Sequence, residues 1–176
     1  MALARSIVVA MLCAATAQAQ TRDETVARCR GADPDAAIAA CTALIDSSRE
    51  SGNDLADAFD ARGTAFAARG TLARAIADFD QAMRLNPSHP TAFVHRGTVY
   101  FRQGVYHQSM QDARSALRIN PSDVDALRLR ALSLARTHQH ALAIQDYDRA
   151  LRLKDSAEIR QLRCESLKAM GPTSGC

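Results

Sequence analysis

The chain has 176 residues, enough for one ordinary domain, and 35 of them are alanine. Alanine favours helices, whereas strands favour β-branched and aromatic side chains; with only 5% aromatic residues the composition argues against an all-β sandwich or barrel. The 23% of charged and 47% of hydrophobic residues argue against wholesale disorder, and a formal net charge of +3 is too small to indicate a nucleic-acid-binding protein.

The first 19 residues have the pattern of a secretory signal. Arg5 precedes an apolar run from Ile7 to Ala17, and Ala17 and Ala19 supply the small residues of a cleavage site. The run is too short for a bilayer, which takes roughly 20 helical residues to span. We therefore expect cleavage after Ala19, export to the periplasm or beyond, and no retained transmembrane helix. A retained membrane anchor is the alternative.

Removal of this segment would leave four cysteines, an even number that suggests disulfides in an exported chain. They are Cys29, Cys41, Cys164 and Cys176. Three pairings are possible, and the most economical joins nearest neighbours, 29 with 41 and 164 with 176; four unpaired thiols are the alternative. A bridge from Cys29 to Cys41 needs Cα atoms within about 7 Å, which favours an extended course for residues 29–33.

Three consecutive segments of 34 residues align without gaps, at residues 56–89, 90–123 and 124–157. Each contains two blocks of apolar residues at helical spacing, separated near position 15 by Gly70 or Gly104 in the first two segments. Pro87 and Pro121 end the second block. Because one helix pair cannot bury its apolar face alone, the pattern predicts a stacked helical solenoid.

This pattern resembles the tetratricopeptide repeat (TPR), a 34-residue helix–turn–helix. The residues that carry the resemblance are Gly63, Ala75, Phe79, Ala82 and Pro87, then Gly97, Tyr100, Ala116 and Pro121. The third segment departs most, with Ala131 in place of glycine. The resemblance implies an all-α fold, a right-handed superhelical solenoid of antiparallel helix pairs. We expect a degenerate repeat over 20–55 and a capping helix with a tail over 158–176.

Arginine and aspartate recur at fixed positions of the repeat. Position 7 is Arg62, Arg96 and Arg130, and position 23 is Asp78, Asp112 and Asp146. These positions lie on the two helices of one unit, so we predict a ladder of Arg–Asp pairs, in which the planar guanidinium suits a carboxylate. The alternative is a set of arginines that bind a phosphate backbone, which the nearly balanced charge disfavours.

In TPR proteins, positions 2, 5, 9, 12 and 13 of the first helix line a concave groove, and the resemblance implies the same here. The candidate groove residues are Asp60, Thr64, Val94, Thr98, Phe101, Arg102, Arg128, Leu132 and Arg136. Phe101 is the one aromatic residue outside the packing positions, so it is either an anchor in the groove or packed on a neighbouring helix. The arginines favour an acidic peptide at the second and third repeats. Asp60 and Thr64 stand where some TPR proteins clamp a C-terminal carboxylate with Lys and Asn, which disfavours that mode.

The sequence has no catalytic-triad, metalloprotease or phosphate-loop motif. His138 and His140 lie in a predicted turn with no third ligand in view, which favours a solvated turn over a metal site. We therefore predict no enzyme activity, no cofactor and no bound metal. The predicted function is a non-catalytic adaptor that binds a peptide segment of another envelope or periplasmic protein in its groove, and no nucleic acid. The alternative is a structural solenoid that self-assembles or acts as a spacer.

Overall fold

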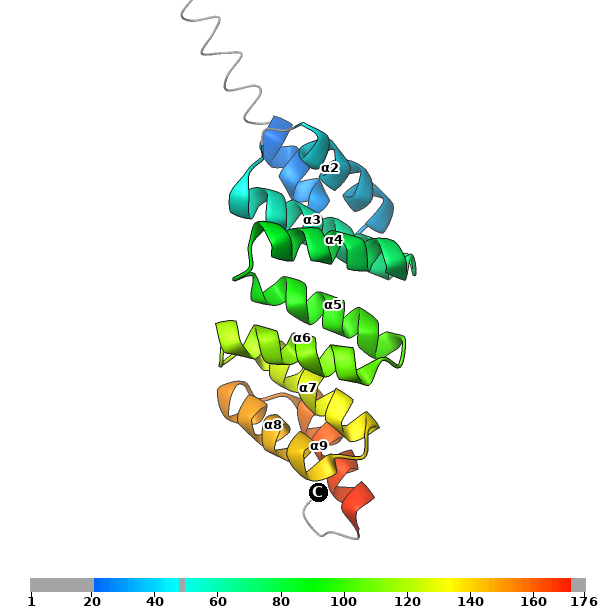
Figure 1. The fold of residues 1–176 in the computed structure, drawn as a ribbon, viewed down its shortest axis with the longest axis vertical. Coiled ribbons are helices and arrows are strands. Elements are labelled where there is room, and N and C mark those ends of the chain that lie inside the picture. Colours follow the sequence, from blue (N-terminus) through cyan, green and yellow to red (C-terminus); the bar gives the residue numbers. More distant parts are fainter. Residues whose placement is uncertain (1–20, 48–49, 172–176) are drawn as a thin grey trace, which may run out of the picture.

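The computed structural model describes residues 21–47 and 50–171, and all regular structure within these ranges is helical. A first helical segment covers residues 21–29. The helices that follow are α2 (Pro34–Asp46), α3 (Gly52–Ala68), α4 (Leu72–Leu85), α5 (Pro90–Arg102), α6 (Tyr106–Ile119), α7 (Val124–Arg136), α8 (His140–Leu153) and α9 (Ala157–Met170). They stack pair upon pair into an elongated solenoid (Figure 1), which confirms the predicted fold class.

The predicted secretory signal over residues 1–19 lies outside the described residues. None of the helices in the described ranges is long and apolar enough to cross a membrane. The helix of the first full repeat, α3, begins at Gly52, four residues before the predicted repeat start at residue 56.

The solenoid has an inner and an outer layer of helices. Within each repeat the two helices pack on one another, α3 on α4, α5 on α6 and α7 on α8. The first helices also contact in succession, α3 with α5 and α5 with α7, whereas within the described ranges α4, α6 and α8 make no contact with one another. The first helices are therefore the more closely spaced, inner layer, and the second helices form the outer layer.

Small residues allow this close packing. The residues at positions 20 and 27 are all fully buried: Ala75, Ser109, Ala143, Ala82, Ala116 and Ala150. At Gly63 an added Cβ would lie 2.7 Å from Cε1 of Phe79, and at Gly97 it would lie 2.9 Å from Cδ2 of Leu129. Neither glycine leaves room for a side chain, since interiors are packed to near-crystalline density.

The turns between paired helices require a left-handed residue. Gly70 and Gly104 have φ of 75° and 78°, a conformation that costs glycine nothing. In the third repeat the same position is His138, with φ of 61°, the one non-glycine residue with positive φ in the described ranges. The departure of the third repeat from the family pattern therefore includes a strained turn.

The predicted Arg–Asp ladder is confirmed in all three repeats. Each arginine donates from Nε and Nη2 to both carboxylate oxygens of its aspartate, with Nε–Oδ2 distances of 2.7 Å (Arg62–Asp78), 3.0 Å (Arg96–Asp112) and 2.7 Å (Arg130–Asp146). The aspartates are buried, and each hydrogen bond raises the pKa of its arginine. Paired charges of this kind hold the register of the two helices more than they add net stability.

A disulfide joins Cys29 to Cys41, with 4.7 Å between Cα atoms, which confirms the first predicted bridge. Residues 30–33 are not helical, and this break brings the end of the first helical segment beside α2. In the second predicted bridge, Cys164 on α9 is disulfide-bonded, and its predicted partner Cys176 lies outside the described residues.

Candidate functional site

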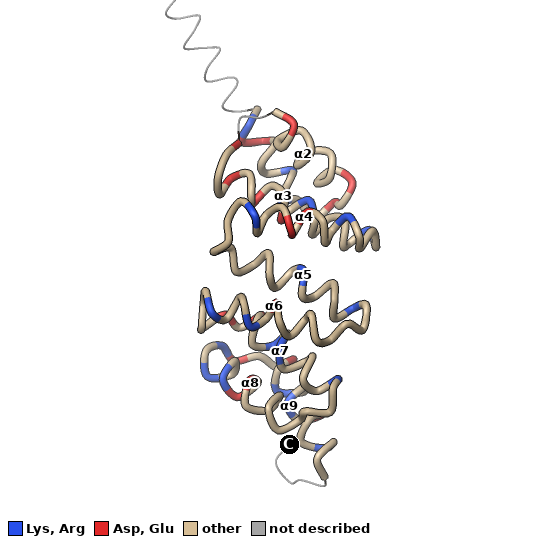
Figure 2. Tube along the Cα trace, in the orientation of Figure 1, with Lys and Arg blue, Asp and Glu red and all other residues tan. Residues whose placement is uncertain are grey.

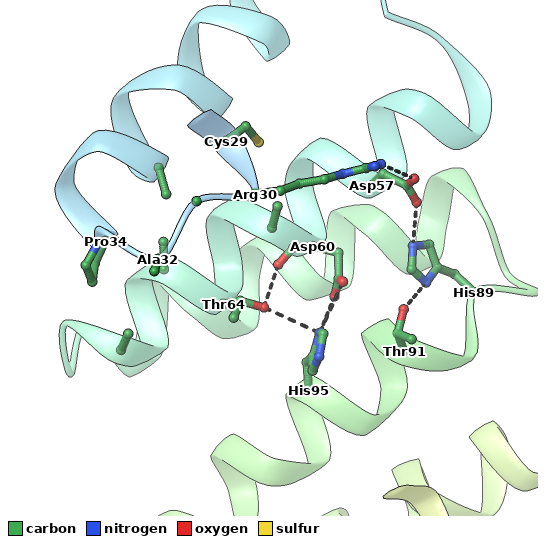
Figure 3. A pocket seen from close by; sticks show the side chains of 15 residues that line it. Cys29, Arg30, Ala32, Pro34, Asp57, Asp60, Thr64, His89, Thr91 and His95 are labelled. Atoms are coloured by element: carbon green, nitrogen blue, oxygen red, sulfur yellow. Dashed lines mark hydrogen bonds and ion pairs between the residues drawn. The ribbon is translucent and has the colours of Figure 1, made fainter. Parts of the chain in front are cut away.

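A cavity of about 470 Å³ opens on the inner layer at the N-terminal end of the solenoid. Its floor comes from α3 and α5, and its wall comes from residues 29–34 and α2 (Figure 3). The disulfide lies in this wall, because Cys29 is itself a lining residue. The bridge therefore holds one side of the cavity in place.

Small side chains create the space. The apolar lining consists mainly of alanines: Ala32, Ala37, Ala61, Ala65 and Ala68. Larger residues at these positions would fill the cavity. The polar groups lie on α3 and at the start of α5, and Ala61, Ala65 and Ala68 line the same floor, so the cavity combines apolar and polar groups.

The first polar group is a pair between His95 on α5 and Asp60 on α3. Nδ1 of His95 lies 2.9 Å from Oδ1 and 3.1 Å from Oδ2 of Asp60, and because a carboxylate only accepts, Nδ1 carries the proton. The hydroxyl of Thr64 donates to the backbone carbonyl of Asp60 (3.0 Å) and lies 3.4 Å from the same ring nitrogen. Burial by itself lowers the pKa of His95, but the hydrogen bond and charge of Asp60 outweigh it and raise that pKa above 6.5.

The second polar group is a chain of contacts around Asp57. Its Oδ2 accepts from Nη2 of Arg30 (2.9 Å), and its Oδ1 lies 2.9 Å from Nε2 of His89. The other ring nitrogen, Nδ1, lies 2.7 Å from the hydroxyl oxygen of Thr91. Arg30 thus ties the disulfide-bonded wall to the floor.

These contacts place two carboxylates, those of Asp57 and Asp60, on the lining of the cavity. Within the described ranges, no group of three or more His, Cys, Asp and Glu residues is arranged to hold a metal ion. Asp57 is the more accessible of the two carboxylates, since its side chain is 41% exposed and that of Asp60 is 12% exposed. Figure 2 shows acidic residues gathered around α2 and α3 and basic residues spread over the C-terminal helices, so the acidic end of the inner layer is the end with the cavity.

The structure brings only part of the predicted groove together. Asp60 and Thr64 line the cavity, whereas Val94 is only 8% exposed and belongs to the core, so the predicted apolar strip does not reach the surface there. Thr98 is exposed and donates to the carbonyl of Val94 on its own helix. Leu132 is half-buried.

Phe101 is half-buried against the core of the second and third repeats, with its ring centroid 5.5 Å from that of Tyr106. The guanidinium of Arg136 lies 5.8 Å above the Phe101 ring and covers part of it. The structure thus supports the packing alternative for this half-buried ring.

The predicted groove arginines differ in what they bind. Arg102 donates from Nη1 to the backbone carbonyl of Ala67 (3.1 Å), and Arg136 lies over aromatic rings. Arg128 instead forms ion pairs with Asp125 (3.7 Å) and Glu158 (3.4 Å). The charge of Arg128 is therefore already matched within the chain, whereas those of Arg102 and Arg136 have no acidic partner in the described ranges.

Sequence reasoning missed His89 and Arg30 as parts of the site. His89 is the last residue of its repeat, so it was outside the groove positions of the first helix. It lies at the start of α5 and reaches Asp57 on the neighbouring first helix. Because His89 directly precedes the first helix of the next repeat, counting it with that helix would have indicated its contact with Asp57. The contact of Arg30 with Asp57 depends instead on the loop that the disulfide shapes.

Two family models match the chain, one described as a TPR repeat over residues 63–104 and one as a tetratricopeptide repeat over residues 96–158. Together they span residues 63–158, more than half of the sequence. The chain belongs to the TPR family. No curated protein matches this TPR protein.

Solved structures with the same fold include several TPR domains. The first TPR of Spaghetti (RPAP3), bound to HSP90 peptide SRMEEVD, has a TM-score of 0.66 and 21% identity and covers 69% of this chain and 98% of that one. The Sgt2 TPR domain from Aspergillus fumigatus has a TM-score of 0.65 and 19% identity, covering 68% and 82%. The TPR2B domain of yeast Sti1, in complex with pHsp70, has a TM-score of 0.62 and 16% identity, covering 64% and 96%. At these identities the likeness concerns the fold.

Proposed function

We propose that this TPR protein is an exported, non-catalytic adaptor that holds a peptide segment of another protein along its inner layer. The observation that carries the proposal is the open cavity of about 470 Å³, with its alanine lining and two carboxylates on its floor. Its fold is shared with TPR domains solved with an HSP90 peptide and with pHsp70, and this likeness supports a peptide as the ligand.

The chemistry of the cavity indicates what the segment carries. Asp57 and Asp60 accept hydrogen bonds, and a basic side chain or a backbone N–H of the segment would donate to them. Further along the inner layer, Arg102 and Arg136 offer positive charge beside the half-buried ring of Phe101. The proposed segment is therefore basic where it enters the cavity and acidic at the second and third repeats.

Export is the second part of the proposal. It rests on the sequence pattern of residues 1–19 and on the buried Cys29–Cys41 disulfide, since such bridges persist in oxidising compartments. Recovery of the protein from the periplasm with Gln20 as its first residue would support export. A protein retained in the cytoplasm with an intact N-terminus would contradict it.

The peptide proposal is tested with a displayed peptide library selected on the mature chain, residues 20–176. Affinities of the recovered peptides are then measured by calorimetry with two variants. Ala68→Trp fills the cavity from an exposed position, and Ala77→Trp adds the same ring to an exposed position on α4. We expect at least tenfold weaker binding for Ala68→Trp and no change for Ala77→Trp.

Equal affinity of the wild type and Ala68→Trp would place any peptide outside the cavity and contradict the proposal. Failure to recover any peptide would do the same and favour a structural solenoid. Circular dichroism of both variants shows whether they remain folded.

A further inference from the structure

The three ladder arginines differ in their remaining guanidinium nitrogen, Nη1. Nη1 of Arg62 donates to the hydroxyl of Thr42 on α2 at 3.1 Å, and Nη1 of Arg96 donates to Oδ1 of Asp80 on α4. In both cases the acceptor lies on the second helix of the preceding repeat. Nη1 of Arg130 has no such acceptor among the described residues, although its Nε and Nη2 bind Asp146 like those of the other two.

Among the described residues, Nη1 of Arg130 lacks an acceptor because of one residue on α6, the second helix of the preceding repeat. The position 34 residues after Asp80 is Arg114, on α6. The boundary between the second and third repeats thus has a cation, Arg114, at the position where the boundary between the first and second repeats has a carboxylate, Asp80. Arg114 is exposed, and it has no hydrogen-bond or ion-pair partner in the part of the chain that the structure describes.

Arg114 and Arg130 line a cavity of about 150 Å³ between α6, α7 and α8. The other lining residues are Leu134, Leu142, Gln145 and Asp146. Two guanidinium groups against one carboxylate leave one positive charge unmatched there. Leu142, at the edge of the cavity, is 48% exposed and gives an incoming chain an apolar contact. Its lining comes from α6, α7 and α8, and it shares no residue with the lining of the inner cavity.

We propose that this outer cavity binds the carboxylate of an acidic side chain, Asp or Glu, from a partner protein. The carboxylate takes the place that Asp80 has at the preceding boundary: it accepts from Nη1 of Arg130 and from the guanidinium of Arg114. Charge-assisted hydrogen bonds of this type are about twice as strong as neutral ones. This site does not depend on the proposed peptide groove and gives the solenoid a second docking point on its opposite layer.

The test uses N-acetyl-glutamic acid amide as probe and N-acetyl-glutamine amide as its neutral match, with the mature chain labelled with nitrogen-15. The shifts of the Nε–H groups of Arg130 and Arg114 report binding. We expect a saturable shift with the glutamate probe and none with the glutamine probe. Arg114→Ala should weaken binding at least tenfold, whereas Arg118→Ala, one turn further along α6, should leave it unchanged.

Three outcomes would overturn the proposal: no saturable shift up to the solubility limit of the glutamate probe, equal shifts in Arg114→Ala, or saturation by inorganic phosphate alone. Arg114→Asp is the second variant, because it builds the missing acceptor into the chain. We expect it to abolish glutamate binding and to raise the melting temperature by about 2–4 °C. A lower melting temperature would show that Arg130 does not need an acceptor there.

Discussion

Nδ1 of His95 on α5 lies 2.9 Å from Oδ1 of Asp60 on α3, so an ionisable pair joins the inner helices of the first two full repeats. The pair is at the floor of the inner cavity, and the acidic groups around it include the more distant Asp125 and Asp123 near the start of α7. Its protonation state sets the charge that a ligand would meet there.

The first prediction concerns the pKa of His95. Burial lowers this pKa and Asp60 raises it, with a net shift above 6.5, so Asp60→Asn should lower the pKa below that of the wild type. Titration of the ring Cε1 proton by NMR measures both values. An unchanged pKa in Asp60→Asn would contradict the pairing.

The same shift makes stability depend on pH. Because the folded pKa is raised, the protonated ring stabilises the fold fully below the unfolded value of 6.5, and this contribution is lost as pH rises through the folded pKa. The difference in melting temperature between the wild type and His95→Gln should therefore shrink as pH rises through this range. A constant difference would contradict the linkage.

The second prediction concerns the Arg–Asp ladder. Arg96→Ala leaves Asp112, which is 4% exposed, without its cation, and a broken buried pair costs about 3–5 kcal/mol. Arg84→Ala, an exposed change on α4, should cost less than about 0.5 kcal/mol. Urea unfolding of both variants and of Arg96→Leu with Asp112→Leu gives the comparison. We expect a smaller loss in the double variant, and a loss below about 1 kcal/mol in Arg96→Ala would argue against the pair.

The third prediction concerns the turn between α7 and α8. His138 has φ of 61° where Gly70 and Gly104 occupy the equivalent turns, and a side chain in this region costs about 1–2 kcal/mol. Part of the gain from glycine is offset by the entropy of the unfolded chain. We expect His138→Gly to raise the free energy of unfolding by about 0.5–1 kcal/mol and Gly104→Ala to lower it. Destabilisation by His138→Gly would indicate contacts of the ring that matter more than strain.

The fourth prediction concerns the disulfide. Cys29 and Cys41 are 12 residues apart, and a loop of this size is worth about 3 kcal/mol in the chain-entropy model. Replacement of both cysteines by serine should therefore lower stability by about that amount. Hydrogen exchange should become faster in residues 30–33, which form part of the cavity wall, with little change in α7. Unchanged exchange in residues 30–33 would mean that Arg30 and Asp57 hold the wall without the bridge.

The sequence by itself determined the repeat, the helix pairs and the Arg–Asp ladder. These features depend on spacing within one helix pair, and a period of 34 residues repeats that spacing, so alignment of the segments reveals Arg62 beside Asp78 without coordinates. The pairing of Cys29 with Cys41 was also within reach, because nearest neighbours along the chain are the economical choice.

Only the tertiary structure decided what happens between repeats. Three contacts depend on how far each repeat is rotated and shifted against the one before it. They are the pairing of His95 with Asp60, the contact of Arg136 with the Phe101 ring, and the placement of Arg114 beside Arg130. That geometry results from the packing of buried side chains along the whole stack, and spacing within a single repeat does not contain it. The inner cavity follows the same rule, since its wall is a loop shaped by a disulfide and its floor is shared by two repeats.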